Sequence, residues 1–598
     1  MPKAKCIVTN NISPYTVHSY YPLKSKMKQE GNKKPDTFEA IFPIQSDVDQ
    51  NYQISYIQDV VDTTWLSAVY PMQLSCLDES GYNQDPTDPA ESRFIKVTSG
   101  KFKGHYALQF TAVGQGVSVP DPRIANSGKI NISGQFDINI FFTPDTTQLQ
   151  DGSDEPILWS FRNGATGLDI GITGTNGNNS SWRVFLRVGT GNYVLLTGSS
   201  ELIMTGAPVH IRVKRGSDNL LKAFVNGVQD ISQSVTQDLQ PTSATNMIFG
   251  DGSGTNADYK GTIHEIKVYC GDTLSDMDAT RVWTTKPIAQ YMKFNGKIRK
   301  LESNQTNKKA VCQSNSYQIT TYKLGDIYSS TPDTHALSST SFKTIVQSAL
   351  DEASSGTFTV RNLDTFSHQQ EVYALGGNIY EIGSVVEFIN ILLTYSECIM
   401  YFTPRKNVII ESDAGHATDN VFDQNNITQG CNIKSSESND IKLATQVVIV
   451  GRTSSVDRSM TPHDGITRTL RRNVRQLGGG TTNHDIYELA QKSIEVLAGK
   501  YGGYYGVPYP KYVIKSMTPI HHVRYNNVVT VKRKNGNNSN VSGITDKDLN
   551  ITLIVKQVEW NYPSGETIIN VGENDIDFYD SSIVETKRTE ELVDTGQN

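Results

Sequence analysis

The sequence predicts a mainly β protein of several domains, with a minor α+β part. Apolar and polar residues alternate in short runs along most of the chain, and Gly, Pro, Asn and Ser separate these runs. Only 20% of the residues are charged, and the many turn-forming residues favour short strands over helical bundles. A chain of 598 residues is too long for one hydrophobic core, so we expect about three or four domains.

The first strands are expected in residues 1–94. Residues 36–43 alternate apolar and polar side chains and then stop at a proline. After the middle of the chain the same pattern resumes, and Asn295-Gly296 predicts a hairpin turn within residues 291–301. The core residues expected in the first segment are Tyr56, Val60, Trp65, Val69 and Leu74.

Residues 95–284 predict a self-contained β-sandwich, because many short strands with turns between them need two packed sheets. Asn226-Gly227 is a strong hairpin signal between two of these strands. The expected strands cover residues 104–110, 116–122, 136–142, 156–161, 168–172, 182–188, 193–196, 209–215, 221–225 and 261–269.

Four phrases of this sandwich carry a resemblance: ALQFTAVGQGVSVPDP, FDINIFFTP, LKAFVNGVQD and YKGTIHEIKVY. They resemble the laminin-G and concanavalin A-like lectin/glucanase superfamily, in the order usual for that superfamily. The resemblance implies two packed sheets and loops at one sheet edge that bind glycans or calcium.

Residues 330–440 predict an α+β domain. Helical spacing appears over 341–350 and again over 384–393, where Ser384 and Glu387 fit a capping box. A hairpin is expected to follow this second helix, with one strand on each side of the turn at residues 404–407.

Residues 441–580 predict a second group of strands with one helix. The strands are expected at 443–450, 529–532, 551–556 and 567–571, with a Tyr-Pro-Ser-Gly turn before the last, and the helix at 485–497. Residues 581–598 are expected to form a flexible acidic tail.

Outside the sandwich, four further phrases carry a second resemblance: KPDTFEAIFP, SVVEFINILLTYSECIMYFTPRKNVIIES, NNVVTVK and IVKQVEWNYPSGETIINVGE. Their order along the chain resembles that of the baseplate hub proteins of tailed viruses. The resemblance implies two tube-like β-barrels. The first is formed discontinuously by residues 1–94 and 285–329 around the inserted sandwich, and the second by residues 441–580. It also implies a homotrimer that contacts the tail tube protein and other baseplate or tail tip proteins.

Five residues of the sandwich are candidates for ligand binding. Asp251, Asn256 and Asp258 lie in one Gly-rich loop and supply the oxygen ligands that Ca²⁺ prefers, although an ordinary turn has the same composition. Trp182 and Tyr193 are able to stack on a sugar ring, but residues of this type more often belong to a sandwich core, which we favour. Apart from this possible calcium ion, no cofactor or metal is expected.

The sequence does not predict an enzyme. Glucanases with this fold place closely spaced carboxylates on one strand, because a nucleophile and a general acid must flank the same bond. Between residues 95 and 284 that spacing is absent: Glu265 stands alone on its strand, and Asp151, Asp154 and Glu155 fall on a loop. Motifs of serine hydrolases, P-loop enzymes and zinc proteases are also absent.

The net charge of −7 argues against broad binding to nucleic acid or to anionic membranes. The six cysteines are scattered, which indicates reduced thiols rather than a zinc site or a disulfide framework. The N-terminus lacks the apolar stretch of a secretory signal, and no apolar run is long enough to span a membrane.

The second resemblance, with which these features are compatible, implies a structural virion protein: a trimeric tail or baseplate hub between tail tube and tip, made in the host cytoplasm. The sandwich would project from it and bind host surface glycans or a partner protein. The alternative is a secreted carbohydrate-binding adhesin or carbohydrate-active enzyme, with the sandwich as its working part.

Overall fold

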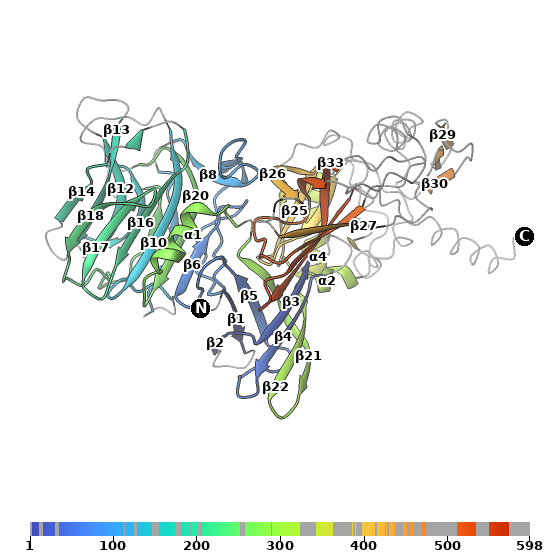
Figure 1. The fold of residues 1–598 in the computed structure, drawn as a ribbon, viewed down its shortest axis with the longest axis horizontal. Helices are drawn as coiled ribbons and strands as arrows, with labels where there is room; N and C mark the ends of the chain where they lie inside the picture. Colours follow the sequence, from blue (N-terminus) through green and yellow to red (C-terminus); the bar gives the residue numbers. More distant parts are fainter. Residues whose placement is uncertain are drawn as a thin grey trace, which may run out of the picture.

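The structure is a computed structural model of the chain, and strands make up most of what it describes (Figure 1). The described residues are 3–10, 16–29, 35–112, 114–124, 128–145, 155–164, 166–174, 181–189, 194–200, 202–203, 206–251, 258–288, 290–322, 342–362, 385–386, 389, 398–412, 415–424, 426, 430–436, 446–450, 455–459, 469–473, 511–533 and 549–572. The predicted mainly β fold is confirmed.

Among the described residues, the largest sheet has 13 strands and combines both ends of the chain. Its members are β1 (Ala4–Thr9), β2 (Val17–Tyr20), β3 (Lys24–Gln29), β4 (Thr37–Pro43), β5 (Gln53–Gln58), β21 (Met292–Ser303), β22 (Asn307–Ser314), β26 (His416–Asp423), β27 (Cys431–Ser436), β31 (Lys511–Ser516), β32 (Asn527–Arg533), β33 (Leu549–Tyr562) and β34 (Thr567–Gly572). The order is β2-β1-β5-β21-β22-β4-β3-β33-β34-β31-β27, with β32 on β33 and β26 on β32.

The described strands do not form two closed barrels, which corrects the sequence prediction. The long strand β33 explains the difference. Its first half pairs with β32, and its second half pairs with β3, from Val558 opposite Gln29 to Tyr562 opposite Ser25. To close a barrel, the C-terminal strands would have to pair along this edge of β33. The N-terminal strand β3 occupies that edge instead. The two groups share one core, which contains Phe38 and Trp560.

Strands that precede and follow the sandwich in sequence lie side by side in this sheet. Strand β5 pairs with β21, with Ile57 opposite Met292, and β4 pairs with β22. The sandwich thus leaves the sheet and returns to it through neighbouring strands. The exact domain boundaries stay predictions, with one difference at the N-terminal side. Strand β6 (Leu66–Tyr70), expected in the first barrel, pairs with a strand of the sandwich.

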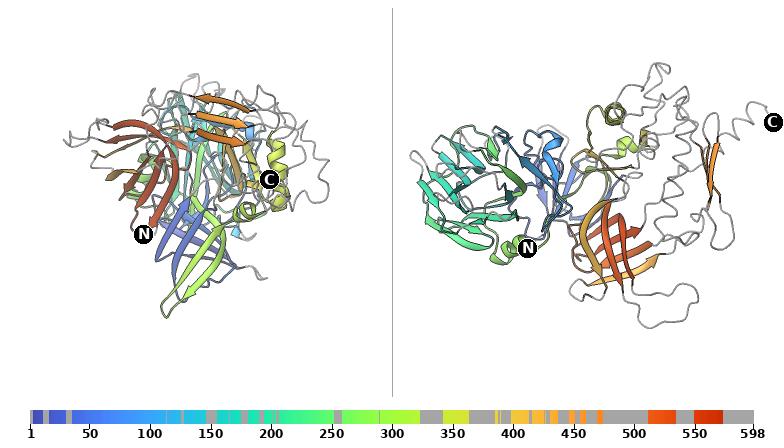
Figure 2. Two further views of the ribbon diagram at one scale, coloured as in Figure 1. Left: turned by 90° about the vertical axis from the view of Figure 1, so that its right-hand side faces the viewer. Right: turned by 90° about the horizontal axis from the view of Figure 1, so that it is seen from above.

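The sandwich consists of two facing sheets, which Figures 1 and 2 show at one end of the molecule. The eight-stranded sheet contains β6, β7 (Phe94–Lys96), β8 (Tyr106–Phe110), β10 (Phe136–Pro144), β16 (Val209–Arg215), β17 (Leu220–Val225), β18 (Val228–Ser234) and β20 (Gly261–Cys270). The seven-stranded sheet contains β9 (Val117–Val119), β11 (Ile157–Asn163), β12 (Thr166–Gly174), β13 (Ser181–Gly189), β14 (Val194–Thr197), β15 (Leu202–Ile203) and β19 (Met247–Phe249). One large apolar core fills the space between them.

Smaller elements complete the described chain. They are the 3-10 helix η1 (Glu91–Arg93), the helices α1 (Asp276–Thr284), α2 (Tyr317–Thr321) and α4 (Phe342–Ser354), and the strands β23 (Thr359–Asn362), β24 (Cys398–Phe402), β25 (Asn407–Ser412), β28 (Gln446–Val450), β29 (Ser455–Ser459) and β30 (Thr469–Asn473). Strands β23, β25 and β24 form one three-stranded sheet, and β29, β28 and β30 form another. Helix α4 and the β24–β25 hairpin confirm the sequence prediction.

Two local predictions are wrong. Asn295-Gly296 is not a turn: β21 runs through it, and the chain reverses after Ser303 instead. A side chain at Gly296 would meet the Gln313 carbonyl oxygen at 2.1 Å, so this glycine allows β22 to approach closely. Trp65, expected in the core, is 45% exposed.

Several predictions fall outside the described residues: the helix at 485–497, the tail at 581–598, most of the helix at 384–393, Tyr193 and Asn256. Within the described chain, no helix has both the length and the apolar character needed to cross a membrane.

Candidate functional site

The outward face of the seven-stranded sheet carries a polar network. Leu168 and Ile170 point into the core, so Asp169 between them points outward. Asp169 Oδ1 accepts a hydrogen bond from Ser160 Oγ over 2.7 Å. Its Oδ2 lies 2.9 Å from Arg162 Nη1 and 3.3 Å from Nη1 of a second arginine, Arg187. Three neighbouring strands thus contribute to one network.

This network is partly open to solvent. The side chains of Arg162 and Arg187 are 14% and 17% exposed, and Arg187 also pairs with Glu155, which is 29% exposed. Leu195 on the adjacent β14 is exposed and adds an apolar contact beside Arg187, to which it is paired. Arginine donors, carboxylate acceptors and a nearby apolar side chain are the groups that recognise sugar hydroxyls and ring faces. We call Glu155, Ser160, Arg162, Asp169, Arg187 and Leu195 the outer sandwich face.

The predicted calcium loop is only partly described. Asp251 lies against Gly116, where an added side chain would meet its Cβ at 2.3 Å. Asp258 accepts a hydrogen bond from the Gly114 N–H over 3.3 Å, and Asn256 lies outside the described residues. Within the described part of the chain, no group of three or more His, Cys, Asp or Glu side chains is suited to a metal. Calcium binding stays a prediction.

Trp182 belongs to the core and not to a ligand surface. It is 0% exposed and packs in the apolar cluster between the two sheets. This placement excludes the stacking role for Trp182 and agrees with the core role that its residue type favours.

Glu265 lies in a buried charge cluster on the other side of the sandwich. It accepts a hydrogen bond from Tyr291 Oη over 2.5 Å, and Lys267 Nζ lies 3.7 Å from its carboxylate. Lys267 also pairs with Asp59 at 3.2 Å, and burial raises the pKa of the Glu265 carboxyl. All four side chains are shielded from solvent, so the cluster joins the sandwich to the first strands of the chain, beside a small pocket that Glu265, Lys267 and Tyr291 line.

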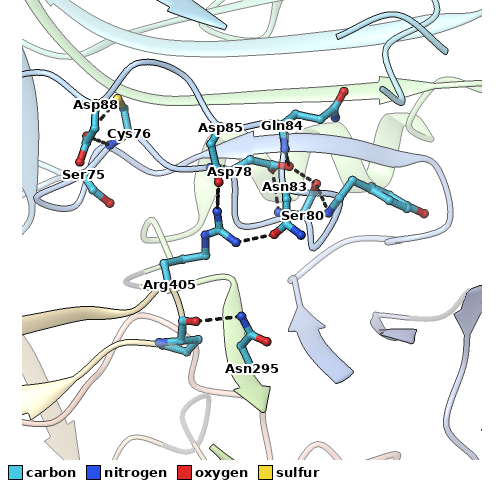
Figure 3. A network of polar contacts seen from close by, with 12 residues as sticks. Ser75, Cys76, Asp78, Ser80, Asn83, Gln84, Asp85, Asp88, Asn295 and Arg405 are labelled. Carbon is cyan, nitrogen blue, oxygen red and sulfur yellow. Dashed lines mark hydrogen bonds and ion pairs between the residues drawn. The ribbon is translucent and has the colours of Figure 1, made fainter. Parts of the chain in front are cut away.

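A second set of polar contacts connects the three-stranded sheet β23-β25-β24 to the chain before the sandwich (Figure 3). We call this sheet the α+β sheet and residues 71–93 the bridging segment. In Figure 3, Arg405 reaches from the β24–β25 turn to Asp85 and to Asn83, whose Oδ1 is 2.6 Å from the guanidinium. Arg361 on β23 pairs with Asp88 in the same way. Two arginines of one small sheet therefore hold one acidic segment.

Asp78 gives the bridging segment its shape. It accepts hydrogen bonds from the backbone N–H groups of Val69, Ser80 and Gln84 over 3.0, 2.9 and 3.1 Å. Ser80 Oγ adds a fourth contact at 2.7 Å. Burial raises the pKa of this carboxyl, while these hydrogen bonds oppose the rise.

A third buried network joins the C-terminal strands to the sandwich. Glu411 on β25 accepts hydrogen bonds from Arg524 Nη2 and Asn526 Nδ2, each over 3.0 Å. His416, on β26, lies 3.4 Å from Tyr106 Oη of β8, and burial lowers the pKa of its ring to about 2. A neutral histidine therefore connects the two parts.

The sequence did not indicate these connecting networks. Arg405 and Asp85 are far apart in the chain, and charged residues in turns are ordinarily exposed. The acidic composition of the bridging segment, with Asp78, Glu79, Asp85 and Asp88, is the one signal that sequence inspection offered.

Residues 114–277 match the family model of the concanavalin A-like lectin/glucanases superfamily. The chain therefore contains a lectin/glucanase-like sandwich, as the sequence phrases predicted. A search of curated proteins gives no match.

Among solved structures, domain 4 of AbnA, an extracellular arabinanase of Geobacillus stearothermophilus bound to arabinotriose, is similar at TM-score 0.28 and 20% identity, covering 37% of this chain and 98% of that one. The binding domain of Paraclostridial Mosquitocidal Protein 1 is similar at TM-score 0.30 and 14% identity, covering 37% of this chain and 52% of that one. A 43 kDa tail protein of prophage MuSo2 from Shewanella oneidensis is similar at TM-score 0.32 and 10% identity, covering 47% and 80%.

Proposed function

We propose that this chain is a structural protein of a viral tail, a baseplate hub that carries a projecting lectin-like sandwich. The observation that carries the proposal is the pairing of β5 with β21. Because of this pairing, the sandwich is an insertion whose two ends both join the 13-stranded sheet, which we call the host sheet, at adjacent strands. Insertion of this kind leaves the core of the host sheet intact, so the host sheet and the sandwich are able to have separate functions.

The hub role is supported by the strands whose sequence resembles hub proteins. The phrases NNVVTVK and IVKQVEWNYPSGETIINVGE form β32, β33 and β34, and β33 joins the N-terminal strands directly. Three copies related by a three-fold axis would form one closed ring against the tail tube. The chain would be made in the host cytoplasm and function in the virion.

The test of the hub role is the oligomeric state of the full chain. Sedimentation velocity over a range of protein concentrations should show a trimer. A strictly monomeric species at the highest concentration would contradict the hub proposal.

The second part of the proposal assigns glycan binding to the outer sandwich face. The family match covers most of this sandwich. The outward side of its eight-stranded sheet packs on the first strands of the chain, where Phe141 and Tyr269 share a cluster with Ile57, so the seven-stranded sheet offers the freer face. The full chain should bind members of a glycan array. Arg187→Ala should weaken that binding about tenfold, because it removes contacts to Asp169 and Glu155. The control is Lys222→Ala on β17, in the opposite sheet.

The alternative function, a carbohydrate-active enzyme, is favoured by the same family match. Against it stands Glu265, which is buried and held by Tyr291 and Lys267. We propose a non-enzymatic protein. Release of reducing sugar from a polysaccharide by the wild-type chain, abolished in Glu265→Gln, would establish the enzyme instead.

A further inference from the structure

Four neighbouring strands of the 13-stranded sheet present a face rich in lysine. The strands run in the order β21-β22-β4-β3, and Figures 1 and 2 show them side by side, extending away from the rest of the chain. Their inward side chains, such as Phe38, Ala310 and Met27, are buried in the shared core. The alternate residues therefore point outward.

The strand register arranges these outward residues in three rows. One row reads Lys24, Ile41, Lys309 and Glu302 across the four strands, the next reads Lys26, Glu39, Val311 and Lys300, and the third reads Lys28, Thr37, Gln313 and Lys297. We call these twelve residues the lysine face.

The lysine face is open to solvent. Lys24 and Lys297 are exposed, and the side chains of Lys26, Lys300 and Lys309 are 50%, 68% and 43% exposed. Two ion pairs within the face are exposed and contribute little to folding stability: Lys309 with Glu39 at 3.3 Å and Lys300 with Glu302. At the border of the face, Lys26 pairs at 3.1 Å with Glu559 of β33, which is 13% exposed. Folding therefore accounts for only part of the lysines on this face.

The charge of the face is opposite to that of the remaining chain. Six lysines and two glutamates give it a formal charge of +4, whereas the whole chain carries −7, so all other residues together carry −11. Because unlike surfaces attract and like surfaces repel, this division favours contact between the lysine face of one copy and another part of the next copy.

The centre of the face indicates a protein partner instead of nucleic acid. Ile41 and Val311 are diagonal neighbours, half-buried, and surrounded by charged residues. An apolar centre within a polar rim is typical of protein interfaces. Glu39 and Glu302 would repel phosphates, and arginine and aromatic side chains, common at nucleic-acid surfaces, are missing from the three rows.

We infer that the lysine face is the surface through which one copy of this chain docks on a second copy, whose residues outside that face carry the opposite net charge. This inference rests on the proposed hub and deepens it by naming the contact that holds the ring. Such a head-to-tail contact joins different patches on the two copies, and it closes into a ring when the rotation between copies permits.

The test compares two double variants with equal changes of charge. Lys24→Glu with Lys300→Glu reverses two exposed lysines of the face. The control, Lys434→Glu with Lys515→Glu, reverses two exposed lysines on β27 and β31 of the same sheet. In sedimentation equilibrium at about 0.1 M NaCl, the apparent dissociation constant of self-association should rise at least about tenfold in the first variant and less than about twofold in the control.

Two further measurements sharpen the test. Raising NaCl to about 0.5 M should weaken wild-type association about tenfold and leave the reversed variant nearly unchanged. The neutral variant Lys24→Gln with Lys300→Gln should lie between wild type and the reversed variant. Circular dichroism of each variant, with the wild-type spectrum expected, establishes that the change acts on association and not on folding.

The outcomes separate this inference from the proposed function. A trimer that persists in the reversed variant would overturn the inference and leave the hub intact, whereas a wild-type monomer would overturn both. Binding of a fluorescent DNA duplex that is lost in the reversed variant, with association unchanged, would assign the face to nucleic acid and overturn the inference.

Discussion

At the scale of single residues, Glu79 and Lys293 are buried ionisable groups at the place where the sandwich joins the host sheet. Glu79 accepts backbone hydrogen bonds from Tyr291 and Met292 over 2.6 and 3.1 Å. Burial raises the pKa of Glu79 to about 7 and lowers the pKa of Lys293 to about 7. Both groups therefore titrate at a different pH in the folded and unfolded chain.

These two pKa changes predict opposite effects on stability. The folded chain holds the Glu79 proton from about pH 4.5 to about 7, so this group's contribution to stability falls as pH rises through that window. The unfolded chain keeps the Lys293 proton from about pH 7 to 10.5, so stability rises with pH there. In urea titrations at several pH values, Glu79→Gln should flatten the fall and Lys293→Met should flatten the rise. Profiles parallel to wild type would contradict this.

Arg405 allows a direct measurement of the contact between the α+β sheet and the bridging segment. Its side chain is 10% exposed and pairs with Asp85. Arg405→Ala should lower the free energy of unfolding by about 1–3 kcal/mol, because it leaves a partly buried carboxylate without its partner. Arg281→Ala is the control: Arg281 is 41% exposed, and its partner Asp278, which is 14% exposed, keeps a hydrogen bond from Ser275 Oγ, so the loss should cost less than about 0.5 kcal/mol.

Residue type correctly predicted that Trp182 is buried, wrongly predicted that Trp65 is buried, and gave no indication of long-range contacts. Trp182 is core, as large aromatic residues in a sandwich usually are. The pairing of Arg405 with Asp85 has no local signal, because the two residues meet only through the fold.

At the scale of elements, a comparison of the dipeptide Asn-Gly at two positions shows how far local sequence determines where a turn forms. Asn226 and Gly227 have φ of 48° and 82° and form the tight turn between β17 and β18, as predicted. Asn295 and Gly296 lie within the continuous strand β21, where the glycine accommodates the backbone of β22. The dipeptide is the same, but tertiary contact with a neighbouring strand overrides the turn preference.

Gly296→Ala should therefore be costly although the residue is not in a turn. The new Cβ would lie 2.1 Å from the Gln313 carbonyl oxygen and 2.7 Å from the Phe294 ring. We expect a loss of about 2–4 kcal/mol in the free energy of unfolding, since backbone cannot move aside cheaply. Gly134→Ala, with no atom within 4 Å of its added Cβ, should change it by less than about 0.5 kcal/mol. Equal effects of the two changes in denaturant titrations would refute this explanation.

The sandwich strands were predictable because their alternation is local, whereas sheet membership was not. The residues of β33 alternate clearly, but nothing in them shows that one end pairs with β32 and the other with β3. Strand β6 was likewise placed with the wrong neighbours, because its partner β20 comes much later in the chain. Period-two patterns indicate strands and their buried faces, and they do not indicate partners.

At the scale of the whole molecule, the pairing of Ile57 with Met292 predicts that the sandwich is removable. Replacing residues 60–290 by a short Asn-Gly turn should let β5 and β21 form an ordinary hairpin. The shortened chain should fold with a lower melting temperature, because the contacts of Glu79 and Asp59 are lost. It should still self-associate and should bind no glycan.

Two results would contradict this view of the molecule. An insoluble shortened chain would mean that the bridging segment is part of the host core. Glycan binding by the shortened chain would place the ligand surface outside the sandwich.

The neighbouring positions of β5 and β21 also determine how the protein bears mechanical load. In the proposed virion, a pull on the sandwich would reach the 13-stranded sheet through the covalent connections to these two strands, roughly along their axes, as well as through the buried networks beside them. Hydrogen bonds between antiparallel strands lie perpendicular to the strand axes, so such a pull loads the bonds of β5 to β1 and of β21 to β22 all at once, in shear. The paired strands are thus arranged to resist tension applied to the sandwich.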